Sequence, residues 1–365
     1  MKVCHMTSAH DSDDVRIFQK ECVSLAKSGH EVCLVARGQS RNEKNVTVIG
    51  VGDAPSGRLK RMFFFSKQIY REALKIDADV YHFHDPELLR AGLKFKKKGK
   101  HVIFDSHENT SEQIKIKKYL PKAARNMASI IYKSIETYIC KKIDAVIFPC
   151  TVDGKNPFAG RCRKTVFINN YPFLSEFSDA EQQNECYDVC VIGSLTCERG
   201  ITYLLEAVNL IGAKVALAGR FSPDEYRDSL EDAGLMDNVD FFGECSRKEV
   251  VDLYGKSKMT VSNILPVGQY SFADNLPTKV YECMAMKKPV VISAMNYPLR
   301  LLDEYKFGIP VKPDNPEEIS AAIKTLISDE NLRRKMGSEG YRAVENEFSW
   351  EKESDKLISL YSEMQ

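Results

Sequence analysis

The sequence has no long apolar run. No stretch of eighteen apolar residues occurs among the 365 residues, and the chain passes from Met1 and Lys2 directly into a short strand-like segment, 3–6. A bilayer-spanning helix needs about 20 apolar residues, and a secretory signal needs an apolar core behind its basic start. We therefore expect neither a transmembrane helix nor a secretory signal, and we expect a cytoplasmic protein.

The cysteines show no pairing pattern. Eleven are scattered along the chain without a CxxC motif, and several, such as Cys33, Cys190 and Cys283, lie inside apolar runs. An odd number of cysteines at such positions is typical of reduced, buried thiols in a cytoplasm.

Two nucleotide-binding motifs are also absent. The sequence contains neither GxGxxG nor GxxxxGK[ST]. These motifs are typical of dinucleotide-dependent oxidoreductases and of P-loop nucleotidases, because their glycines let backbone amides approach phosphate. Their absence disfavours both classes.

Net charge is nearly absent, but it is unevenly distributed. Lys and Arg number 52 and Asp and Glu 51, so no global field attracts a polyanion. Residues 91–125 nevertheless hold ten basic and three acidic residues, mostly within Lys94–Lys100 and Lys115–Lys122. One interpretation is a solvated helix face, and the other is contact with an anionic membrane or a phosphate-bearing, lipid-linked acceptor. Nucleic acid is not expected, because no aromatic stacking platform accompanies the charge.

Short apolar runs alternate with helical segments along most of the chain. The polar segment 171–186 interrupts this alternation, which restarts at 187. Near-continuous apolar strands between helices are typical of parallel sheets covered on both faces. We therefore expect two doubly wound α/β domains, 1–170 and 187–345, joined by a linker at 171–186. Ligands should bind at the carboxyl ends of the strands, in a cleft where the two domains face each other.

Several residues carry helix-start signals. Ser246 followed by Glu249 predicts a capping box, and Asn315 followed by Pro316 predicts a capped helix with proline in its first turn. We also expect Asp13 to cap the helix that carries Arg16, and Asp85 to cap a helix after the strand at 80–83.

The segment 270–292 carries the sharpest functional signal. Pro277 suits the first turn of a helix, whose free amides and positive potential favour a diphosphate. Glu282 lies further along that helix, where a carboxylate is useful if it accepts hydrogen bonds from ribose hydroxyls. The plainer alternatives are a surface ion pair between Glu282 and Lys279, and a turn role for Asp274.

The chain resembles the retaining GT-B glycosyltransferases of family four, the group related to glycogen synthase. The resemblance rests on segments distributed over the whole chain: Asp274 and Glu282 eight residues apart, Lys288–Val291, Gly193–Leu195 with Arg199, Ala218–Arg220, Val239–Gly243, Asp105–Glu108 and Phe348–Trp350. It implies two facing Rossmann-like domains with a cleft between them, and a terminal helix, 346–365, that returns to the first domain.

The resemblance also implies roles for individual residues. The donor-binding residues would be Gly193, Ser194, Arg199, Arg220, Asn275, Leu276, Pro277, Thr278, Lys279 and Glu282. The catalytic residues would be His107, Asp274 and Glu282, and the acceptor side would hold Asp13, Arg16, His84 and Glu108. Three features depart from the family pattern: Asp274 replaces the usual Glu, Ser194 replaces a basic residue, and the loop 7–14 is not glycine-rich.

The implied reaction is sugar transfer with retention from a nucleotide diphosphate-sugar, with a UDP-sugar as the expected donor. The acceptor would be a glycan or a lipid-linked glycan in cell-envelope or surface polysaccharide synthesis. No metal or other cofactor is expected, because electrostatic contacts would stabilise the departing diphosphate. The enzyme would be cytoplasmic, with peripheral contact to the inner face of the membrane.

Three other functions stay open from the residues alone. A non-catalytic, nucleotide-sugar-binding accessory subunit would explain Asp274 and Ser194. A metal-dependent hydrolase would use His82, His84 and His107, because the spacing of His82 and His84 puts both on one face of a strand. A nucleotide-sugar epimerase would convert the donor without an acceptor.

Overall fold

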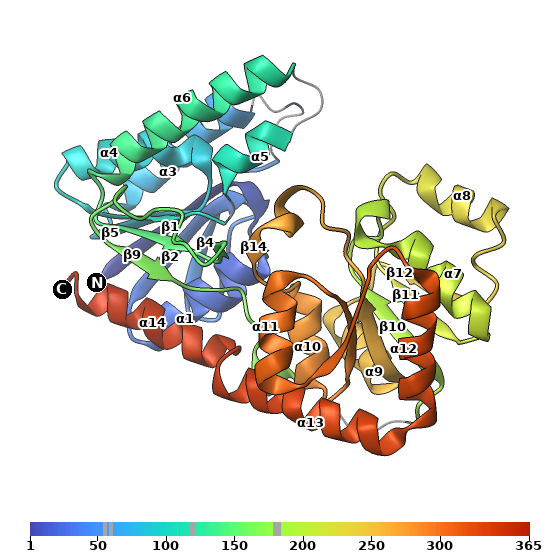
Figure 1. Cartoon of the computed structure of the whole chain (residues 1–365). Helices are drawn as coiled ribbons and strands as arrows, with labels where there is room; N and C mark the ends of the chain where they lie inside the picture. The colour runs from blue at the N-terminus through green and yellow to red at the C-terminus, as the bar shows by residue number, and fades with distance from the viewer. Residues whose placement is uncertain (54–56, 58–60, 108, 117–120, 178–183) are drawn as a thin grey trace. The chain divides into compact units, whose positions relative to one another are not determined.

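The computed structural model describes residues 1–53, 57, 61–107, 109–116, 121–177 and 184–365. The chain divides into two compact units (Figure 1). Unit 1 comprises Met1–Asn170 and Lys352–Gln365, and unit 2 comprises Tyr171–Glu351. Part of the expected linker, 178–183, lies outside the described residues, whereas Tyr171 and Phe177 are buried in the core of unit 2.

Unit 1 is built on a sheet with the strand order β3-β4-β2-β1-β5-β6-β7-β9. Neighbouring strands run parallel, and β3 runs antiparallel to β4. The strands of unit 1 are β1 (Lys2–Asp11), β2 (Glu31–Arg37), β3 (Arg41–Glu43), β4 (Val46–Gly50), β5 (Val80–Phe83), β6 (His101–Asp105), β7 (Ala145–Phe148), β8 (Thr151–Val152) and β9 (Thr165–Phe167).

Helices cover both faces of this sheet. Figure 1 shows α3, α4, α5 and α6 on one side and α1 and α14 on the other. The helical segments are the π-helical turns Val15–Cys22 and Arg61–Phe65, the 3-10 turn Pro86–Leu88, α1 (Val23–Lys27), α3 (Ser66–Ile76), α4 (Leu89–Lys97), α5 (Thr110–Ile116), α6 (Lys122–Cys140) and α14 (Trp350–Ser362), of which the residues from Lys352 belong to unit 1.

The two faces of the central strands differ in chemistry. Phe83 and Phe104 pack with Phe95 of α4 in an apolar core. His82, next to Phe83 in β5, points to the opposite face, because successive residues of a strand alternate sides. His82 is fully buried, and so is His5, its neighbour in β1. Unit 1 therefore has a dry apolar core on one face and a buried polar cluster on the other.

Unit 2 is built on a parallel sheet with the order β12-β11-β10-β13-β15-β16. Its strands are β10 (Tyr187–Ile192), β11 (Val215–Ala218), β12 (Val239–Gly243), β13 (Ser257–Ser262), β14 (Ala273–Asp274), β15 (Val290–Ser293) and β16 (Gly308–Val311). Its helices are α7 (Ile201–Ile211), α8 (Glu225–Asp232), α9 (Arg247–Gly255), α10 (Thr278–Ala285), α11 (Asn296–Tyr305), α12 (Pro316–Ser328) and α13 (Glu330–Asn346), with 3-10 turns at Leu174–Glu176, Cys197–Arg199 and Gly268–Ser271.

Unit 2 has apolar cores on both faces of its sheet. Cys190 of β10 packs in one core with Tyr254 and Met284, whereas Val189 packs in the other with Leu204. This alternation confirms the expected doubly wound arrangement. The local helix-start signals are confirmed too: Ser246 and Glu249 form a capping box, and Asn315 caps α12 ahead of Pro316.

Two expected caps are wrong. The side chain of Asp14, not of Asp13, accepts the amide of Ile17 and caps the π-helical turn. Asp13 is a neighbour at the surface and pairs with Arg41. Asp85 makes no capping bond, because its carboxylate accepts the amide of Ser8 at 2.6 Å and the hydroxyl of Thr7 at 2.8 Å.

We looked for a helix that could span a membrane. Among the described residues, no helix is both long enough and apolar enough to cross a bilayer.

Glycines allow two turns of unit 2 to come into close contact. Gly219, after β11, has φ of +133°, and a Cβ there would stand 1.7 Å from the carbonyl oxygen of Gly193, after β10. Only glycine fits such a backbone approach. These turns end the two strands at the edge of the sheet where ligands bind in doubly wound folds.

We predict that Gly219→Ala lowers the free energy of unfolding by about 3 kcal/mol, because it adds a steric clash to an unfavourable φ. Gly234→Ala is the matched control. Gly234 has φ of +65° with no atom near its Cβ position, so that change should cost about 1 kcal/mol. Urea unfolding of both full-length variants measures the difference, and equal losses would contradict the close contact.

Candidate functional site

Unit 2 holds a crevice at the carboxyl ends of its central strands. It encloses about 420 Å³, open to solvent, and adjoins a second crevice of about 340 Å³ that shares Ser262, Ile264 and Pro277. The first is lined by Val191, Ile192, Ser194, Arg199, Ile201, Thr260, Val261, Ser262, Ile264, Pro277, Lys279 and Val280. The second brings in Asn275 and Leu276. Six of the expected donor-binding residues therefore meet around one pair of crevices.

The turn after β10 places Arg199 in the first crevice. Thr196 caps the short 3-10 turn by accepting the amide of Arg199, and Gly200 follows with φ of +74°. Asn263 secures the turn, because its side-chain amide donates to the carbonyl of Gly200 at 2.9 Å. The guanidinium of Arg199 donates to the hydroxyl of Tyr270 at 3.3 Å. Sequence reasoning missed Asn263 and Tyr270, which no motif marks.

The start of α10 adds free backbone donors to the same crevice. Pro277 precedes the helix with φ of −55°, and Thr278 and Lys279 form its first turn. The first amides of a helix have no partner within it, and they carry the positive end of its dipole. The crevice thus combines backbone donors with two cationic side chains, Arg199 and Lys279, a combination that suits a diphosphate.

Glu282 lies in α10 behind Lys279. Its side chain is 9% exposed, with Oε2 at 3.1 Å from Nζ of Lys279 and Oε1 at 2.9 Å from Nη1 of Arg247. The sequence suggested the pair with Lys279 as the plainer alternative, and it missed Arg247. Glu282 is not among the described residues that line either crevice, so its link to the crevice runs through Lys279.

The remaining donor-side candidates lie further out. Asp274 is buried and accepts a hydrogen bond from Arg300 of α11 at 2.9 Å. The side chain of Arg220 is 72% exposed and lies 3.7 Å from Asp224. Gly193 acts through its backbone, at the close contact with Gly219.

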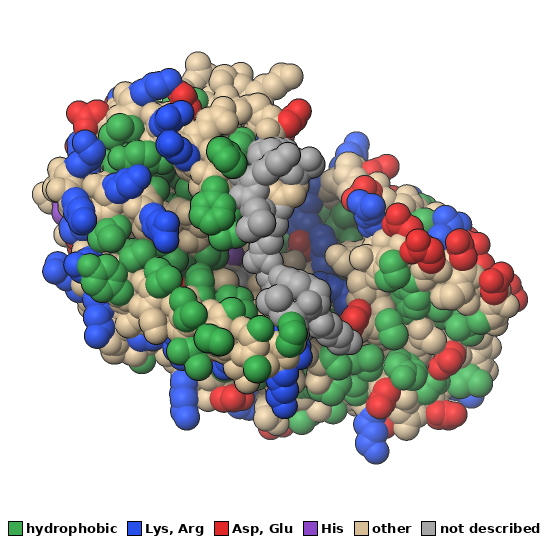
Figure 2. All heavy atoms as spheres, turned by 90° about the horizontal axis from the view of Figure 1, so that it is seen from above, with side chains coloured by type: hydrophobic (Ala, Val, Ile, Leu, Met, Phe, Trp, Pro, Cys, Tyr) green, Lys and Arg blue, Asp and Glu red, His purple; other side chains and the backbone are tan. Residues whose placement is uncertain are grey.

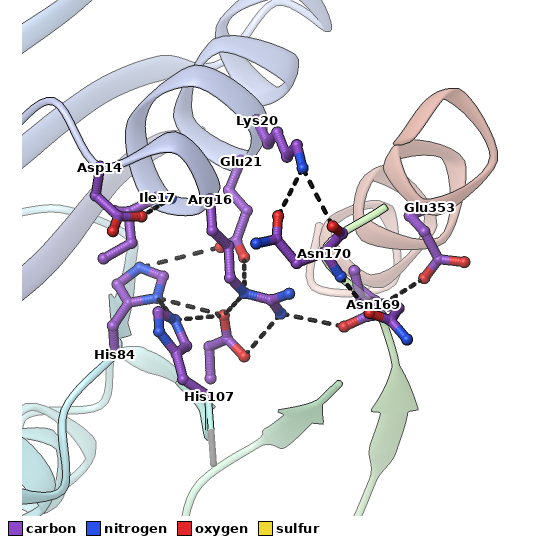
Figure 3. Close-up of polar contacts among 12 residues, drawn as sticks. Asp14, Arg16, Ile17, Lys20, Glu21, His84, His107, Asn169, Asn170 and Glu353 are labelled. Carbon is purple, nitrogen blue, oxygen red and sulfur yellow. Dashed lines mark hydrogen bonds and ion pairs between the residues drawn. The ribbon is translucent and has the colours of Figure 1, made fainter. Parts of the chain in front are cut away.

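The acceptor-side candidates of unit 1 gather around Asp105 at the end of β6 (Figure 3). Arg16 donates to both carboxylate oxygens, at 2.8 Å and 3.0 Å, and to the carbonyl of Ile168 at 3.1 Å. His107 Nε2 lies 3.1 Å from Asp105 Oδ2 and 3.1 Å from Nδ1 of His84. The structure thus brings Arg16, His84 and His107 together. Glu108 lies outside the described residues, and Asp13 pairs with Arg41 instead.

The expected loop at 7–14 is largely a strand, because β1 extends to Asp11. Hydrogen bonds from Thr7 and Ser8 to Asp85 hold this extension against the end of β5.

Electrostatics keep the Asp105 carboxylate ionised, and burial favours the neutral forms of His84 and His82. Burial raises the pKa of Asp105, but the Arg16 guanidinium and the contacts with His107 and His84 together outweigh burial and hold that pKa well below its usual range. Burial lowers the pKa of His84 to about 4 and the pKa of His82 well below its ordinary value. Burial also raises the pKa of Glu21, which lies 3.1 Å from Arg16.

The hydrolase hypothesis grouped His82, His84 and His107, and the structure groups them differently. His107 and Asp105 lie on the Nδ1 side of His84. His82 instead joins His5 and Glu21 near the Nε2 side of His84. The sequence pattern missed His5 and Glu21, because strand pairing and a π-helical turn bring them to His84 from distant parts of the chain.

Arg16 balances a fully buried carboxylate, so we predict that Arg16→Met lowers the free energy of unfolding by about 3–5 kcal/mol. The matched control is Arg37→Met. Arg37 also pairs with an aspartate, Asp11, but both side chains are more than a third exposed, so the loss should be at most about 1 kcal/mol. Denaturant unfolding checks both values. A small loss for Arg16→Met would mean that Asp105 does not depend on this arginine.

Two family models match the chain, one in each unit. The model of glycosyl transferases group 1 matches residues 175–343, and the model of glycosyltransferase family 4 matches residues 19–153. Among curated proteins, the α-D-kanosaminyltransferase of Streptomyces kanamyceticus is 25% identical over 183 residues, which are 48% of this chain and 45% of that protein. The chain spans less than half the length of the curated relatives it matches.

Solved structures match over the whole chain. Sucrose-phosphate synthase from Thermosynechococcus elongatus has a TM-score of 0.76 at 17% identity, covering 100% of this chain and 99% of that one. Anabaena HepE in complex with UDP and glucose has a TM-score of 0.69 at 14% identity, with full coverage of both chains. The fold is therefore the GT-B fold, and the chain belongs to glycosyltransferase family 4, with the group 1 domain in unit 2.

Proposed function

We propose that the protein transfers a sugar from a nucleotide diphosphate-sugar, with UDP as the nucleotide, to a glycan or lipid-linked acceptor. The observation that carries the proposal is the crevice of unit 2, where Arg199, Lys279 and the first amides of α10 converge. The structural neighbour HepE, which was solved with UDP, UDP and glucose, or UDP-glucose, supports UDP as the nucleotide.

The chemistry of the crevice fits a diphosphate leaving group. Arg199 and Lys279 supply two positive charges, and the start of α10 supplies backbone donors. Such preorganised groups stabilise the charge that develops on the diphosphate as the bond to the sugar breaks. In the proposed transfer, Arg199 and Lys279 neutralise the negative charge of the leaving diphosphate without a catalytic metal. The absence of a basic side chain at Ser194 then has little effect on diphosphate binding, because these two cations remain.

The proposed transfer retains the configuration of the sugar. The acceptor hydroxyl attacks from the face that the diphosphate leaves, the new C–O bond forms as the old one breaks, and the acceptor proton passes to a diphosphate oxygen. His107 is the proposed acceptor-side residue. Its side chain is 16% exposed, and Asp105 fixes its Nε2 at 3.1 Å, which leaves the other edge of the ring for the sugar or acceptor.

We predict that UDP binds unit 2 and raises the melting temperature of the full-length protein. Arg199→Met should weaken UDP binding about 10- to 100-fold, because it removes a charge-assisted hydrogen bond to phosphate. The control is Arg334→Met, an exposed arginine of α13 paired with Glu330, which should leave UDP affinity unchanged. Isothermal titration measures both, and equal affinities for the two variants would argue against this crevice.

The same titration distinguishes two roles for Glu282. As a ribose ligand, Glu282→Ala weakens UDP binding but not pyrophosphate binding. As a support for Lys279 only, it weakens both. Slow hydrolysis of the UDP-sugar by the wild type, lost in Glu282→Ala, would reject a non-catalytic accessory subunit. Conversion of the donor to an epimer without an acceptor would favour the epimerase instead.

We also propose that unit 1 contacts an anionic membrane, which would suit a lipid-linked acceptor and a peripheral site on the cytoplasmic face. The helix α6 exposes apolar side chains at helical spacing: Met127, Ile130, Ile131, Ile135 and Tyr138 are each at least 44% exposed. Exposed lysines lie in or directly after α6 and its neighbour α4, namely Lys97, Lys98, Lys122, Lys133, Lys141 and Lys142. Figure 2 shows apolar and basic side chains intermixed over this part of unit 1.

The structure reduces the number of lysines in the basic stretch that are candidates for membrane contact, because several of them have partners within unit 1. Lys96 pairs with Asp144 at 2.7 Å, Lys100 with Asp77 at 2.7 Å, and Lys115 with Glu112 at 2.7 Å. Lys94 lies over the ring of Tyr70. Residues 117–120 lie outside the described residues. Lys97, Lys98 and Lys122, which are all exposed, are therefore the members of this stretch best suited to a membrane.

We predict that the protein sediments with vesicles containing anionic phospholipid and not with vesicles of phosphatidylcholine alone. Lys97→Gln with Lys98→Gln should weaken this binding about 30-fold, at roughly 1 kcal/mol per lysine, and high salt should abolish the difference. Ile130→Glu should also reduce binding. Leu210→Glu, at an equally exposed leucine of α7 in unit 2, is the control. If vesicle binding is unaffected by these substitutions and by salt, the basic stretch is a solvated helix face and not a membrane-binding surface.

A further inference from the structure

Unit 1 contains a buried cluster of three histidines and one glutamate that the proposed transfer does not use. His5 comes from β1, His82 and His84 from β5 and the residue after it, and Glu21 from the π-helical turn Val15–Cys22. All four side chains are fully shielded from solvent. Each offers one ligand atom, and these atoms all lie within 4.8 Å of one another.

Four of the distances between these ligand atoms can be compared with the edges of a tetrahedral site. Glu21 Oε2 is 4.0 Å from His5 Nδ1, 3.8 Å from His82 Nε2 and 4.0 Å from His84 Nε2. His5 Nδ1 and His84 Nε2 are 3.0 Å apart. A tetrahedral zinc site with ligands at about 2.0–2.1 Å has edges of about 3.3 Å. The observed spacings bracket that value, so small shifts of the side chains would complete the coordination.

The cluster is incompletely satisfied by the protein itself. Oε2 of Glu21 and Nε2 of His82 are both buried, and neither atom has a hydrogen-bond partner. Oε1 of Glu21 has an ion-pair contact with Arg16, whereas Oε2 faces the three imidazoles. Buried polar atoms are normally bonded, and a group of them converging on one point indicates a missing partner. Three imidazole nitrogens and one carboxyl oxygen converging on one point form a donor set that suits a cation.

Each histidine also has a polar contact at its second ring nitrogen, the one that faces away from the centre of the cluster. His82 Nδ1 is 2.9 Å from the hydroxyl of Tyr361, and His5 Nε2 is 3.4 Å from the same hydroxyl. His84 Nδ1 is 3.4 Å from Asp105 Oδ2. Such outer contacts fix which ring nitrogen faces the centre and are typical around metal-bound histidines. Figure 3 shows Glu21 and His84 pointing toward each other beside Arg16.

We propose that unit 1 binds one divalent transition-metal ion, with zinc as the best fit, through His5 Nδ1, His82 Nε2, His84 Nε2 and Glu21 Oε2. Nitrogen and oxygen ligands in a tetrahedral arrangement suit Zn²⁺. The protein supplies all four ligands in a solvent-free position, so the site is structural and not hydrolytic. The ion ties β1, β5 and the π-helical turn together, and Tyr361 extends this link to α14.

The test uses untagged full-length protein, because a histidine tag would itself bind metal. Elemental analysis should find about one zinc per chain. Dialysis against a chelator should lower the melting temperature, and added Zn²⁺ should restore it. Substitution with Co²⁺ should give the visible absorption bands of a tetrahedral site. All these measurements use the wild type, so they hold even if a variant fails to fold.

Variants assign the ligands. Glu21→Gln and His82→Gln should each lose the bound zinc, whereas His101→Gln, at a 43% exposed histidine of the same unit, should retain it. Circular dichroism and a cooperative unfolding transition report the folding of each variant and do not depend on the zinc site or on UDP binding. Zinc lost only from the two cluster variants supports the site. Absence of zinc from the wild type together with no response to added Zn²⁺, or equal zinc in all variants, overturns it.

Discussion

The polar half of unit 1 depends on the ion pair between Arg16 and Asp105. Asp105 is fully buried at the end of β6, where an uncompensated carboxylate would be strongly unfavourable. Arg16 meets it with two hydrogen bonds and reaches the carbonyl of Ile168 as well. Because the pair keeps Asp105 ionised, the same carboxylate can orient both His84 and His107. The Asp105 carboxylate, compensated by Arg16, therefore positions His107, the candidate acceptor residue, and His84, one member of the histidine cluster.

Unit 2 builds its crevice mainly from backbone. Close contact between Gly193 and Gly219 brings two strand ends together, and the start of α10 presents amides beside Arg199 and Lys279. Only a change to proline removes a backbone donor, so the contribution of the backbone is kept when most side chains of the site change. This explains how Ser194 can stand in place of a basic residue while the crevice still suits a diphosphate. Glu282 forms ion pairs with Lys279 and with Arg247, and Lys279 links it to the crevice.

Much of the fold could be predicted from the sequence, because its signals are local. Apolar runs predicted the strands, Ser246 and Glu249 predicted a helix start, and the segment around Pro277 predicted a site that lies at the crevice of unit 2. Contacts between distant parts of the chain could not be predicted. The cap at Asp14 instead of Asp13 depends on where the π-helical turn begins, and the pairing of Lys96 with Asp144 joins residues 48 positions apart.

The histidines show this limit most clearly. Strand periodicity placed His82 and His84 on one face, but it could not show that His5 lies beside them or that Glu21 and Tyr361 cover them. The hydrolase alternative therefore grouped His82 and His84 with His107, whereas the structure places two different environments on the two ring nitrogens of His84. His84 presents Nε2 to the buried cluster and Nδ1 to Asp105 and His107. An ion bound to Nε2 would keep the proton of His84 on Nδ1. His84 Nδ1 would then be a hydrogen-bond donor toward Asp105 and His107. The buried cluster would then orient the candidate acceptor residue without touching any substrate.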